Sequence, residues 1–306
     1  MQPLTALLLD TALTALWPLI GKAGLAHYSG CLFAAAGLLI GLAVMSPWML
    51  QEGRWRLVIS REVAPTLFAM GLFSGVATVI YISAMAYTTP ANGSIMAQIE
   101  VLYSAGLCAY FLGEALSLQQ SLASLLVVAG TGLIMFHDLS SPRWKGDLMI
   151  LATPWMYQAS HIFSKRLPKG IDPITVSGGR VFYGIIALTP FCLWDLAHGA
   201  RWSWSAPALA ILLAQGVGMS SINFILWYKA ILRMDLAKAT AIILAYPALT
   251  VLFSWALGQE TIQPVQLLGL VVTLSGALWM SKLVLAAQKK AHGEAPVLPG
   301  ETAAEI

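Results

Sequence analysis

The sequence predicts an all-α membrane protein with ten transmembrane helices in two inverted five-helix repeats. Three observations lead to this fold class. First, 58% of the 306 residues are apolar and only 10% are charged, whereas a soluble chain has about 45–50% apolar and about 25% charged residues. Second, the apolar residues gather in long continuous runs. Third, the second half of the chain repeats features of the first.

Each apolar run is long enough to cross the apolar core of a bilayer, which takes about 20 helical residues. The runs lie at residues 4–22, 29–48, 64–86, 91–112, 120–137, 146–166, 174–195, 206–229, 236–257 and 264–285. They are continuous, whereas a membrane β-barrel has short alternating segments. Turn residues separate them, as at Pro90 with Gly93 and at Pro168 with Gly170. The runs therefore predict ten spanning helices.

The two ends of the chain differ in character. The first run carries Asp10 and lacks both a basic leading segment and a small-residue cleavage site. We therefore expect it to be the first membrane span and not a removed signal. Residues 289–306 are polar, and we expect them to form a disordered cytoplasmic tail.

The distribution of lysine and arginine predicts the orientation, because basic residues concentrate in cytoplasmic loops. With a cytoplasmic N-terminus, 12 basic residues fall on the inside. Four fall on the outside, namely Lys22, Arg143, Lys145 and Arg201, and Arg180 stays within a span. We therefore predict a multi-pass protein of the bacterial inner (plasma) membrane with both termini in the cytoplasm.

A shift of 146 residues aligns the two halves of the chain. It places Glu114 on Glu260, Gln120 on Gln266, Gly130 on Gly276, Ala84 on Ala230 and Ala91 on Ala237. We expect the first repeat at 1–139 and the second at 140–288. An odd number of spans per repeat forces the two repeats into opposite orientations. Inverted repeats are typical of transporters, whose binding sites lie near the membrane midplane between the halves.

Composition and motifs exclude several other classes. The net charge of +3 is spread along the chain, so no basic face for nucleic acid is expected. Cys31, Cys108 and Cys192 lie in apolar runs without metal-binding spacing, and we expect buried structural thiols. We expect no metal and no cofactor. Neither a catalytic motif nor a phosphate-binding loop occurs, so we expect no enzyme activity and no drive by ATP within this chain.

Two segments resemble a known family. Residues 99–114 read IEVLYSAGLCAYFLGE and resemble the fourth helix of an EamA-type half, with the fifth ending in Ala129-Gly130. Residues 245–260 read AYPALTVLFSWALGQE and resemble the matching ninth helix. Two departures stand out. Glu100-Val101 replaces the common aromatic-Pro or Glu-Pro, and Gly-Gln-Glu at 258–260 replaces Leu-Gly-Glu.

Trp17 with Lys22, and Trp155 with Lys165, resemble the opening helix of each half. Over nearly its whole length the chain therefore resembles the EamA-like branch of the drug/metabolite transporter superfamily. The resemblance implies a secondary transporter that exports a small organic metabolite by alternating access. It leaves the substrate open, because the family exports amino acids, nucleosides, drugs and other metabolites. The expected partners are that solute, the lipid bilayer and, as a candidate coupling ion, the proton. The chain would act as a monomer or a homodimer.

Ionisable residues within the spans are the first candidates for the transport site, because each costs about 2.5–3.5 kcal/mol to insert. Glu100 lies midway along the fourth run, on a face with Gly93, Ala97 and Tyr103. It is either a proton-carrying or cation-binding carboxylate, or a structural carboxyl bonded to a neighbouring helix. Tyr103 shares its face and is a candidate contact residue.

Arg180 and Asp10 are the other two charges within the runs. Arg180 could hold a substrate carboxylate through its planar guanidinium, pair with Glu100 or Asp10, or reach the cytoplasmic surface. Asp10 shares a helical stripe with Thr14 and faces either the cavity or cytoplasmic water. Glu100 with Arg180 would suit an amino-acid-like zwitterion.

Uncharged and aromatic residues complete the candidate set. His161 is either a proton relay or a histidine satisfied between helices. Asn223 either contacts the solute or hydrogen-bonds across helices. Tyr246 precedes Pro247, which breaks the ninth helix at mid-membrane and frees a carbonyl. Trp17 and Trp155 complete the set through the family resemblance.

Other functions remain as alternatives. One is an uncoupled metabolite facilitator in which Glu100 and Arg180 only balance each other. A different class is a membrane sensor or an intramembrane enzyme. A sensor would need a signalling domain, and an enzyme would need a nucleophile with a base. The sequence shows neither, so a proton-coupled or uncoupled carrier is favoured.

Overall fold

The computed structural model describes residues 2–51, 53–100, 102–103, 106, 117–138, 143–233, 239, 243, 246–259 and 261–293, and all regular structure in these ranges is helical. The helices are α1 (Pro3–Gly24), α2 (Gly30–Met49), α3 (Arg54–Val58), α4 (Ala64–Ala84), α5 (Pro90–Met96), η1 (Ala97–Ile99), α7 (Leu118–Asp138), α8 (Trp144–Leu151), α9 (Pro154–Ser164), α10 (Pro173–Ala197), α11 (Ala206–Leu213), η2 (Ala214–Asn223), α12 (Phe224–Ile231), α14 (Tyr246–Ala256) and α15 (Pro264–Gly293). Cys108, Glu114 and Glu260 lie outside the described residues.

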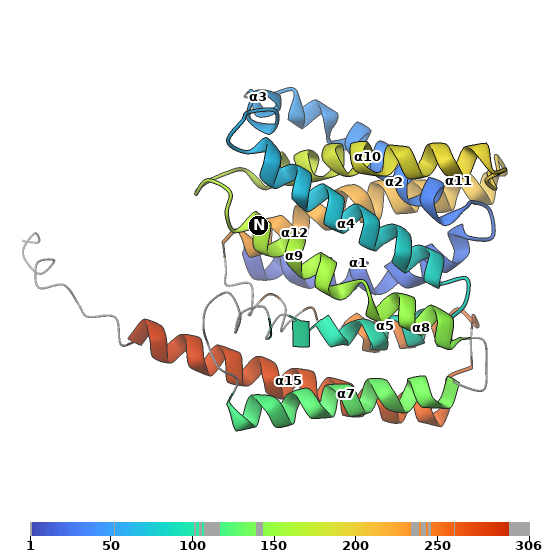
Figure 1. The fold of residues 1–306 in the computed structure, drawn as a ribbon, viewed down its shortest axis with the longest axis vertical. Helices are drawn as coiled ribbons and strands as arrows, with labels where there is room; N and C mark the ends of the chain where they lie inside the picture. Colours follow the sequence, from blue (N-terminus) through green and yellow to red (C-terminus); the bar gives the residue numbers. More distant parts are fainter. Residues whose placement is uncertain are drawn as a thin grey trace, which may run out of the picture.

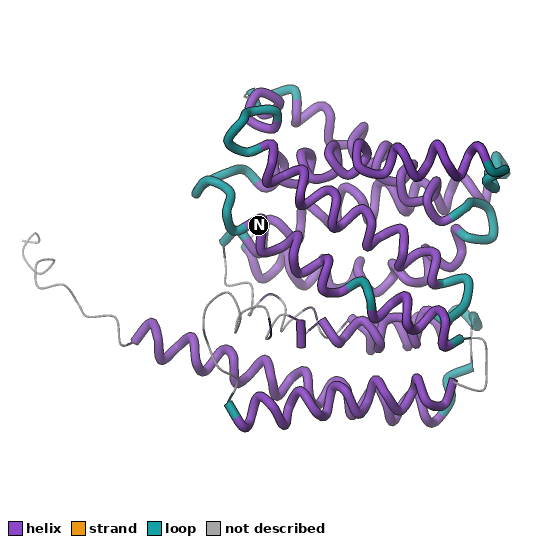
Figure 2. The backbone as a smooth tube through the Cα atoms, viewed as in Figure 1, coloured by secondary structure: helices purple, strands orange, loops and turns teal. Residues whose placement is uncertain are grey.

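Five helical segments are long and apolar enough to cross a membrane: α1, α2, α4, α10 and the continuous stretch Ala206–Ile231. Leu118–Leu133 and Pro264–Met280 are shorter apolar helices. The helices run side by side, with α7 and α15 paired along one side of the bundle (Figure 1). Loops gather at its two ends, as the tube in Figure 2 shows. α15 continues to Gly293, past Lys289, where we expect the tail to begin.

The pairing of α7 with α15 is reciprocal. A Cβ at Gly130 would come within 2.3 Å of Thr273 Oγ1, and a Cβ at Gly276 would come within 2.8 Å of the Val127 backbone N. The 146-residue shift that places Gly130 on Gly276 also places Val127 on Thr273. Because higher numbers on one helix meet lower numbers on the other, α7 and α15 are antiparallel.

The second helices of the two halves are also antiparallel neighbours. Near one end, Cys31 of α2 lies beside Cys192 of α10. Near the other end, a Cβ at Gly178 of α10 would meet Met49 of α2. Equivalent helices of the two halves thus run in opposite directions in two separate places.

A lysine at the end of the opening helix of each half reaches the end of a later helix. Lys22 Nζ donates to the carbonyl oxygens of Met85 and Thr88. Lys165 Nζ donates to the carbonyl oxygen of Ile231. Met85 and Ile231 again differ by 146 residues. A lysine near unpaired carbonyls at a helix C-terminus is favourable because it complements their partial negative charge.

The predicted sixth span, 146–166, is not one continuous helix. α8 ends at Leu151, and α9 begins at Pro154 after a turn at Ala152 and Thr153. Pro154 causes this break, since proline lacks the N–H that would continue the helix and is favoured at a first helical position. Thr153 closes the turn by donating its hydroxyl to the Ile150 carbonyl over 2.9 Å.

Glycines bring two pairs of helices into close contact. A Cβ at Gly41 would come within 2.8 Å of Ser220 on η2, and one at Gly71 would come within 2.5 Å of the Gly184 backbone on α10. η2 is a π-helical stretch within the Ala206–Ile231 segment. Such widened turns often occur at functional sites. The glycines bring α2 against η2 and α4 against α10, which positions the polar residues of both partners.

Candidate functional site

One cavity at the centre of the bundle collects most of the predicted site residues. Its lining comes from α1, α2, α4, α9, α10 and the Ala206–Ile231 stretch. Glu100, at the end of η1, and Tyr246, at the start of α14, also line it. Water-molecule centres can occupy about 130 Å³ of it, enough for several waters or a small solute. Seven of the nine predicted residues line it: Asp10, Trp17, Glu100, His161, Arg180, Asn223 and Tyr246.

Glu100 closes the short helix η1 and faces α9. Its Oε1 accepts a hydrogen bond of 2.6 Å from Gln158 Nε2. Gln158 itself is buried, so an amide dipole, and not a cation, is the neighbour that orients this carboxyl. Glu100 therefore has both features that the sequence left open, a partner on a neighbouring helix and a place on the cavity wall.

Arg180 is held by three neighbours. Its Nε donates to Ser74 Oγ over 2.9 Å, one terminal nitrogen donates to the Tyr228 hydroxyl over 3.3 Å, and the guanidinium lies 4.1 Å from the Phe224 ring centre. Only 3% of the residue is exposed, so the predicted alternative of reaching the membrane surface is wrong. Neither predicted ion pair, with Asp10 or with Glu100, forms between these described residues.

Asp10 lies across the cavity without a hydrogen-bond partner. It is 1% exposed, and both carboxylate oxygens are buried and unpaired. The predicted alternative in which Asp10 reaches cytoplasmic water is therefore wrong. A buried, unpaired carboxylate is costly unless a ligand or a proton completes it.

Asn223 ties η2 to α1 beside Asp10. Its Nδ2 donates to Thr14 Oγ1 over 2.9 Å and to the Asp10 carbonyl oxygen over 3.3 Å. The hydrogen bond across helices that the sequence proposed is therefore present, and Asn223 lines the cavity as well. This bond holds the backbone of α1 at the residue that carries the unpaired carboxylate.

Aromatic rings form one wall. The Trp17 ring stacks on Tyr81, with centroids 4.3 Å apart and planes 11° apart, and meets the edge of Tyr157 at 6.0 Å. The Tyr157 hydroxyl shares a hydrogen bond of 3.1 Å with the Thr78 hydroxyl. Tyr246 donates its hydroxyl to the Ser94 carbonyl over 3.3 Å. A wall of rings favours apolar or aromatic groups of a solute.

Unpaired polar atoms concentrate on the cavity. Within the described part of the chain, five lining residues have buried polar atoms without a hydrogen-bond partner: Asp10, Tyr81, His161, Gln215 and Trp227. His161 leaves Nδ1 unpaired while its ring lies 4.9 Å from that of Trp227. Because buried polar groups are nearly always paired, this cluster indicates a surface made to meet water or a polar ligand.

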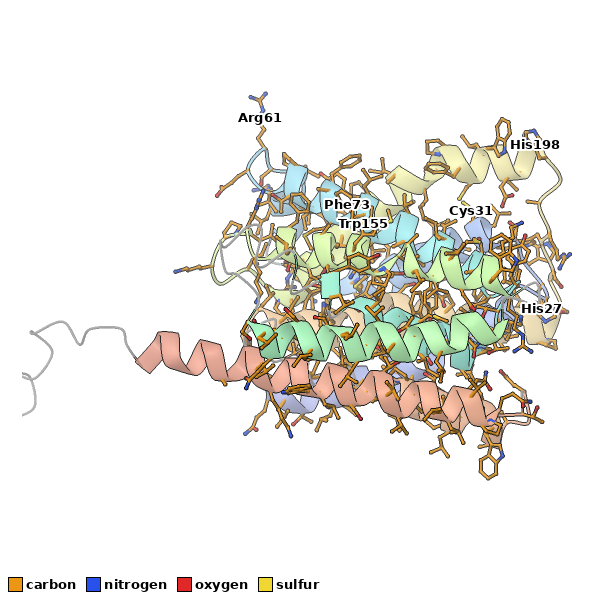
Figure 3. The ribbon with its side chains drawn as sticks, turned by 60° about the horizontal axis from the view of Figure 1, so that its bottom comes forward. His27, Cys31, Arg61, Phe73, Trp155 and His198 are labelled. Carbon is orange, nitrogen blue, oxygen red and sulfur yellow. The ribbon has the colours of Figure 1, made fainter. Side chains whose placement is uncertain are left out.

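Two predicted residues lie outside the cavity lining. The Tyr103 hydroxyl donates to the Leu151 carbonyl over 3.2 Å. Trp155 is 41% exposed and meets the edge of Phe73 at 5.8 Å (Figure 3). Trp17 precedes Lys22 by five residues, and Trp155 precedes Lys165 by ten. The difference turns Trp155 about 140° around its helix, which places it on the outer face.

Sequence reasoning missed several lining residues, among them Tyr81, Gln215 and Trp227. The 146-residue shift could have found two of them, since it places Tyr81 on Trp227. It likewise places Glu100 on Tyr246, and all four residues line the cavity. No sequence signal marks Gln215, which lies in the π-helical stretch and lines the cavity.

The model of the EamA-like transporter family matches twice, at residues 2–136 and 144–282. A protein of Streptantibioticus cattleyicolor named "Probable terminal-alkyne amino-acid exporter" is 26% identical over 65% of this chain and 67% of its own length. The "Uncharacterized transporter YoaV" of Bacillus subtilis is 22% identical over 83% of this chain and 88% of its own. A solved crystal structure, 18% identical, covers 94% of this chain and 99% of its own with a TM-score of 0.67, which shows a shared fold.

Proposed function

Because the chain belongs to the EamA-like transporter family, which makes it a multi-pass membrane transporter and not an enzyme, we propose that it exports an amino-acid-like solute by alternating access. The observation that carries the substrate class is the pairing of opposite charges in one cavity. Asp10 and Arg180 both line it, and neither neutralises the other through a direct contact. Two acids and one guanidinium leave room for one further positive charge.

The architecture proposed for this transporter is ten spanning helices in two inverted repeats, at 1–139 and 140–288. Its support is the antiparallel arrangement of α7 with α15 and of α2 with α10, together with a family model that matches each half. In such transporters one half rocks against the other around a fixed midplane site. Residues from both halves line the present cavity, as this mechanism requires.

We propose that the end carrying Arg54 faces the cytoplasm. Arg54 Nε pairs with Asp172 Oδ2 over 3.2 Å, which joins two loops predicted to lie inside. At the opposite end, the Lys145 ammonium lies 4.6 Å from the Tyr87 ring, and both belong to loops predicted to lie outside. Arg54 and Lys145 therefore each contact a residue that is predicted to lie on the same side of the membrane. The bacterial inner membrane is the proposed location, with both termini in the cytoplasm.

The proposed binding mode places the two ends of a zwitterion on opposite charges. The substrate ammonium donates hydrogen bonds to the Asp10 carboxylate, whose oxygens have no hydrogen-bond partner in the protein. The substrate carboxylate approaches Arg180, whose guanidinium is fixed by Ser74 and Phe224 and can offer its planar N–H groups. The substrate side chain meets the aromatic wall at Trp17 and Tyr157.

Coupling to protons is proposed at Glu100. Its carboxyl lines the cavity and accepts one hydrogen bond from an uncharged amide, so it can gain a proton without breaking an ion pair. Proton entry would then accompany substrate exit. The alternative is an uncoupled facilitator. In the described geometry Glu100 contacts Gln158 and not Arg180, which weakens the form of that alternative in which the two charges only balance each other.

Counterflow in proteoliposomes tests the substrate class. Vesicles loaded with an unlabelled amino acid are diluted into a labelled amino acid, its decarboxylated amine or its deaminated acid. We expect the zwitterion to exchange faster than either analogue, because only the zwitterion satisfies both charges. Equal exchange of all three, or exchange of the amine alone, would show that the paired-charge site is wrong.

A further inference from the structure

A pair of thiols outside the cavity connects the two halves. Cys31 is the second residue of α2, and Cys192 lies near the C-terminal end of α10. Their Sγ atoms are 3.2 Å apart, and both residues are free cysteines in the structure. Figure 3 shows Cys31 toward the end of the bundle that carries His27 and His198, away from Arg61.

The two thiols are held against each other by their surroundings. Ser29 donates its hydroxyl to Asp195 Oδ2, so the residue two positions before Cys31 is bonded to the one three positions after Cys192. The Ser29 backbone N–H also donates to the Arg201 carbonyl over 3.0 Å, and Arg201 donates to the Leu25 carbonyl over 3.2 Å. These bonds hold the α2 and α10 ends side by side.

The environment differs for the two sulfurs. Cys31 is 9% exposed, while Cys192 is half-buried among exposed residues of the α10 end. Cys192 is therefore the more exposed of the two thiols. The sequence predicts buried structural thiols, and the burial of Cys31 agrees with that prediction. It does not account for a second thiol directly opposite on the other half of the chain.

We propose that Cys31 and Cys192 are a reversible disulfide site that links the two halves at their extracytoplasmic end. The oxidant is a disulfide of the compartment outside the cytoplasm, carried by a small molecule or by a disulfide oxidoreductase, since disulfides persist there. The Cys192 thiolate attacks one sulfur of the oxidant and releases one thiol. The Cys31 thiolate then attacks the Cys192 sulfur of the mixed disulfide and releases the second thiol. Two cysteine thiols are oxidised, and one oxidant disulfide is reduced to two thiols.

The link has a consequence for transport, which rests on the proposed function. α2 belongs to the first half and α10 to the second, so a covalent bond between them restricts any rocking that separates their ends. The oxidised protein is then held closed on this side, and reduction releases it. The disulfide also removes conformational freedom from the unfolded chain, which raises the temperature of unfolding.

The test uses the purified full chain with oxidised glutathione as the probe. Wild type, Cys31→Ala, Cys192→Ser and Cys108→Ser are treated, alkylated and mapped by peptide mass. We expect a Cys31–Cys192 cross-linked peptide pair in wild type and in Cys108→Ser. Cys31→Ala and Cys192→Ser should show at most a glutathione adduct. Recovery of both residues as alkylated peptides from oxidised wild type would overturn the site.

Two further readouts separate the link from the transport proposal. The unfolding temperature of wild type should rise on oxidation and return with a phosphine reductant, whereas that of Cys192→Ser should not change. Counterflow should fall in proportion to the cross-linked fraction in wild type and Cys108→Ser only. Full cross-linking with undiminished counterflow would overturn the restraint. Absence of counterflow in reduced protein would count against the proposed function and leave the mapped disulfide standing.

Discussion

The two halves of the molecule agree in their scaffold and differ in their cavity. In the scaffold, matching positions hold the same residue making the same contact. Gln120 Oε1 accepts from the Ser117 backbone N–H over 2.7 Å, and Gln266 Oε1 accepts from the Gln263 backbone N–H over 2.8 Å. Both bonds have the geometry of a capping box, which fixes the start of a helix. The glycines of α7 and α15 repeat in the same manner. Lys22 and Lys165 are 143 residues apart, but their carbonyl partners Met85 and Ile231 again differ by 146.

In the cavity, matching positions hold different residues. The 146-residue shift pairs Glu100 with Tyr246, Tyr81 with Trp227, Thr78 with Phe224 and Ala97 with Ile243, and all eight line the cavity. The carboxyl of Glu100 therefore corresponds to the phenol of Tyr246 at the equivalent position of the other half, and the hydroxyl of Thr78 corresponds to the ring of Phe224.

This difference separates two requirements of one transporter. Alternating access needs halves of similar shape, so that each can take the position of the other, and the scaffold keeps that similarity. A solute with distinct ends needs an asymmetric site, which the cavity provides through Asp10 and Arg180. Substitutions at equivalent cavity positions should therefore change different steps of transport. Substitutions at equivalent scaffold positions should lower the stability of the protein by similar amounts.

The largest effect is expected from Arg180→Ala. The change removes the donor to Ser74 and Tyr228, together with the cation that shares the cavity with Asp10 and Glu100. Arg180 donates two hydrogen bonds, and a hydrogen bond to a charged group contributes about 1.5–3 kcal/mol. We expect the loss of these contributions in the free energy of unfolding, measured by thermal unfolding in detergent. Arg180→Lys keeps the positive charge but lacks the planar guanidinium, so its free energy of unfolding should lie between those of wild type and Arg180→Ala. An alanine variant as stable as wild type would show that the contacts of Arg180 with Ser74 and Tyr228 do not stabilise the bundle.

Asp10→Asn should have the next largest effect, and on transport before stability. The amide keeps the size of the side chain but removes the negative charge for an ammonium group. We expect the counterflow rate for the zwitterion to fall roughly tenfold to a hundredfold. This corresponds to the loss of one hydrogen bond to a charged group, which is worth about 1.5–3 kcal/mol. The deaminated acid should lose less, because it has no ammonium. Glu62→Gln, an exposed acid outside the cavity, is the matched control and should match wild type.

The scaffold half of the comparison is tested by Gly130→Ala and Gly276→Ala. Each adds a Cβ that meets backbone of the partner helix, at 2.6 Å from Thr273 N or 2.8 Å from Val127 N. Overpacking of this kind costs about 1–3 kcal/mol, and the two variants should lower the unfolding temperature by similar amounts. Gly218→Ala meets open space and is the control. A large effect from one glycine and none from the other would show that the contact is not reciprocal.

How much of this could be predicted depends on the kind of signal. The all-helical membrane fold followed from composition, and the repeat followed from Gly130 on Gly276. Charged residues within apolar runs identified Asp10, Glu100 and Arg180, all of which line the cavity. The rest depends on tertiary structure. Whether a tryptophan faces a cavity or lipid depends on helix rotation, and Trp155 differs from Trp17 by about 140°.

Glu100→Gln should have the smallest effect at equal pH and a specific one across a pH gradient. Glutamine keeps a polar group beside Gln158 Nε2, so exchange without a gradient should stay within about threefold of wild type, or roughly 0.7 kcal/mol. Wild-type efflux should accelerate when the external medium is acidified, because proton entry then drives substrate exit. In Glu100→Gln that acceleration should disappear, since an amide cannot carry the proton. Tyr246→Phe, at the matching position of the other half, should keep it. If the glutamine variant still accelerates, the proton enters elsewhere or not at all, and the asymmetry of Glu100 and Tyr246 serves binding instead of coupling.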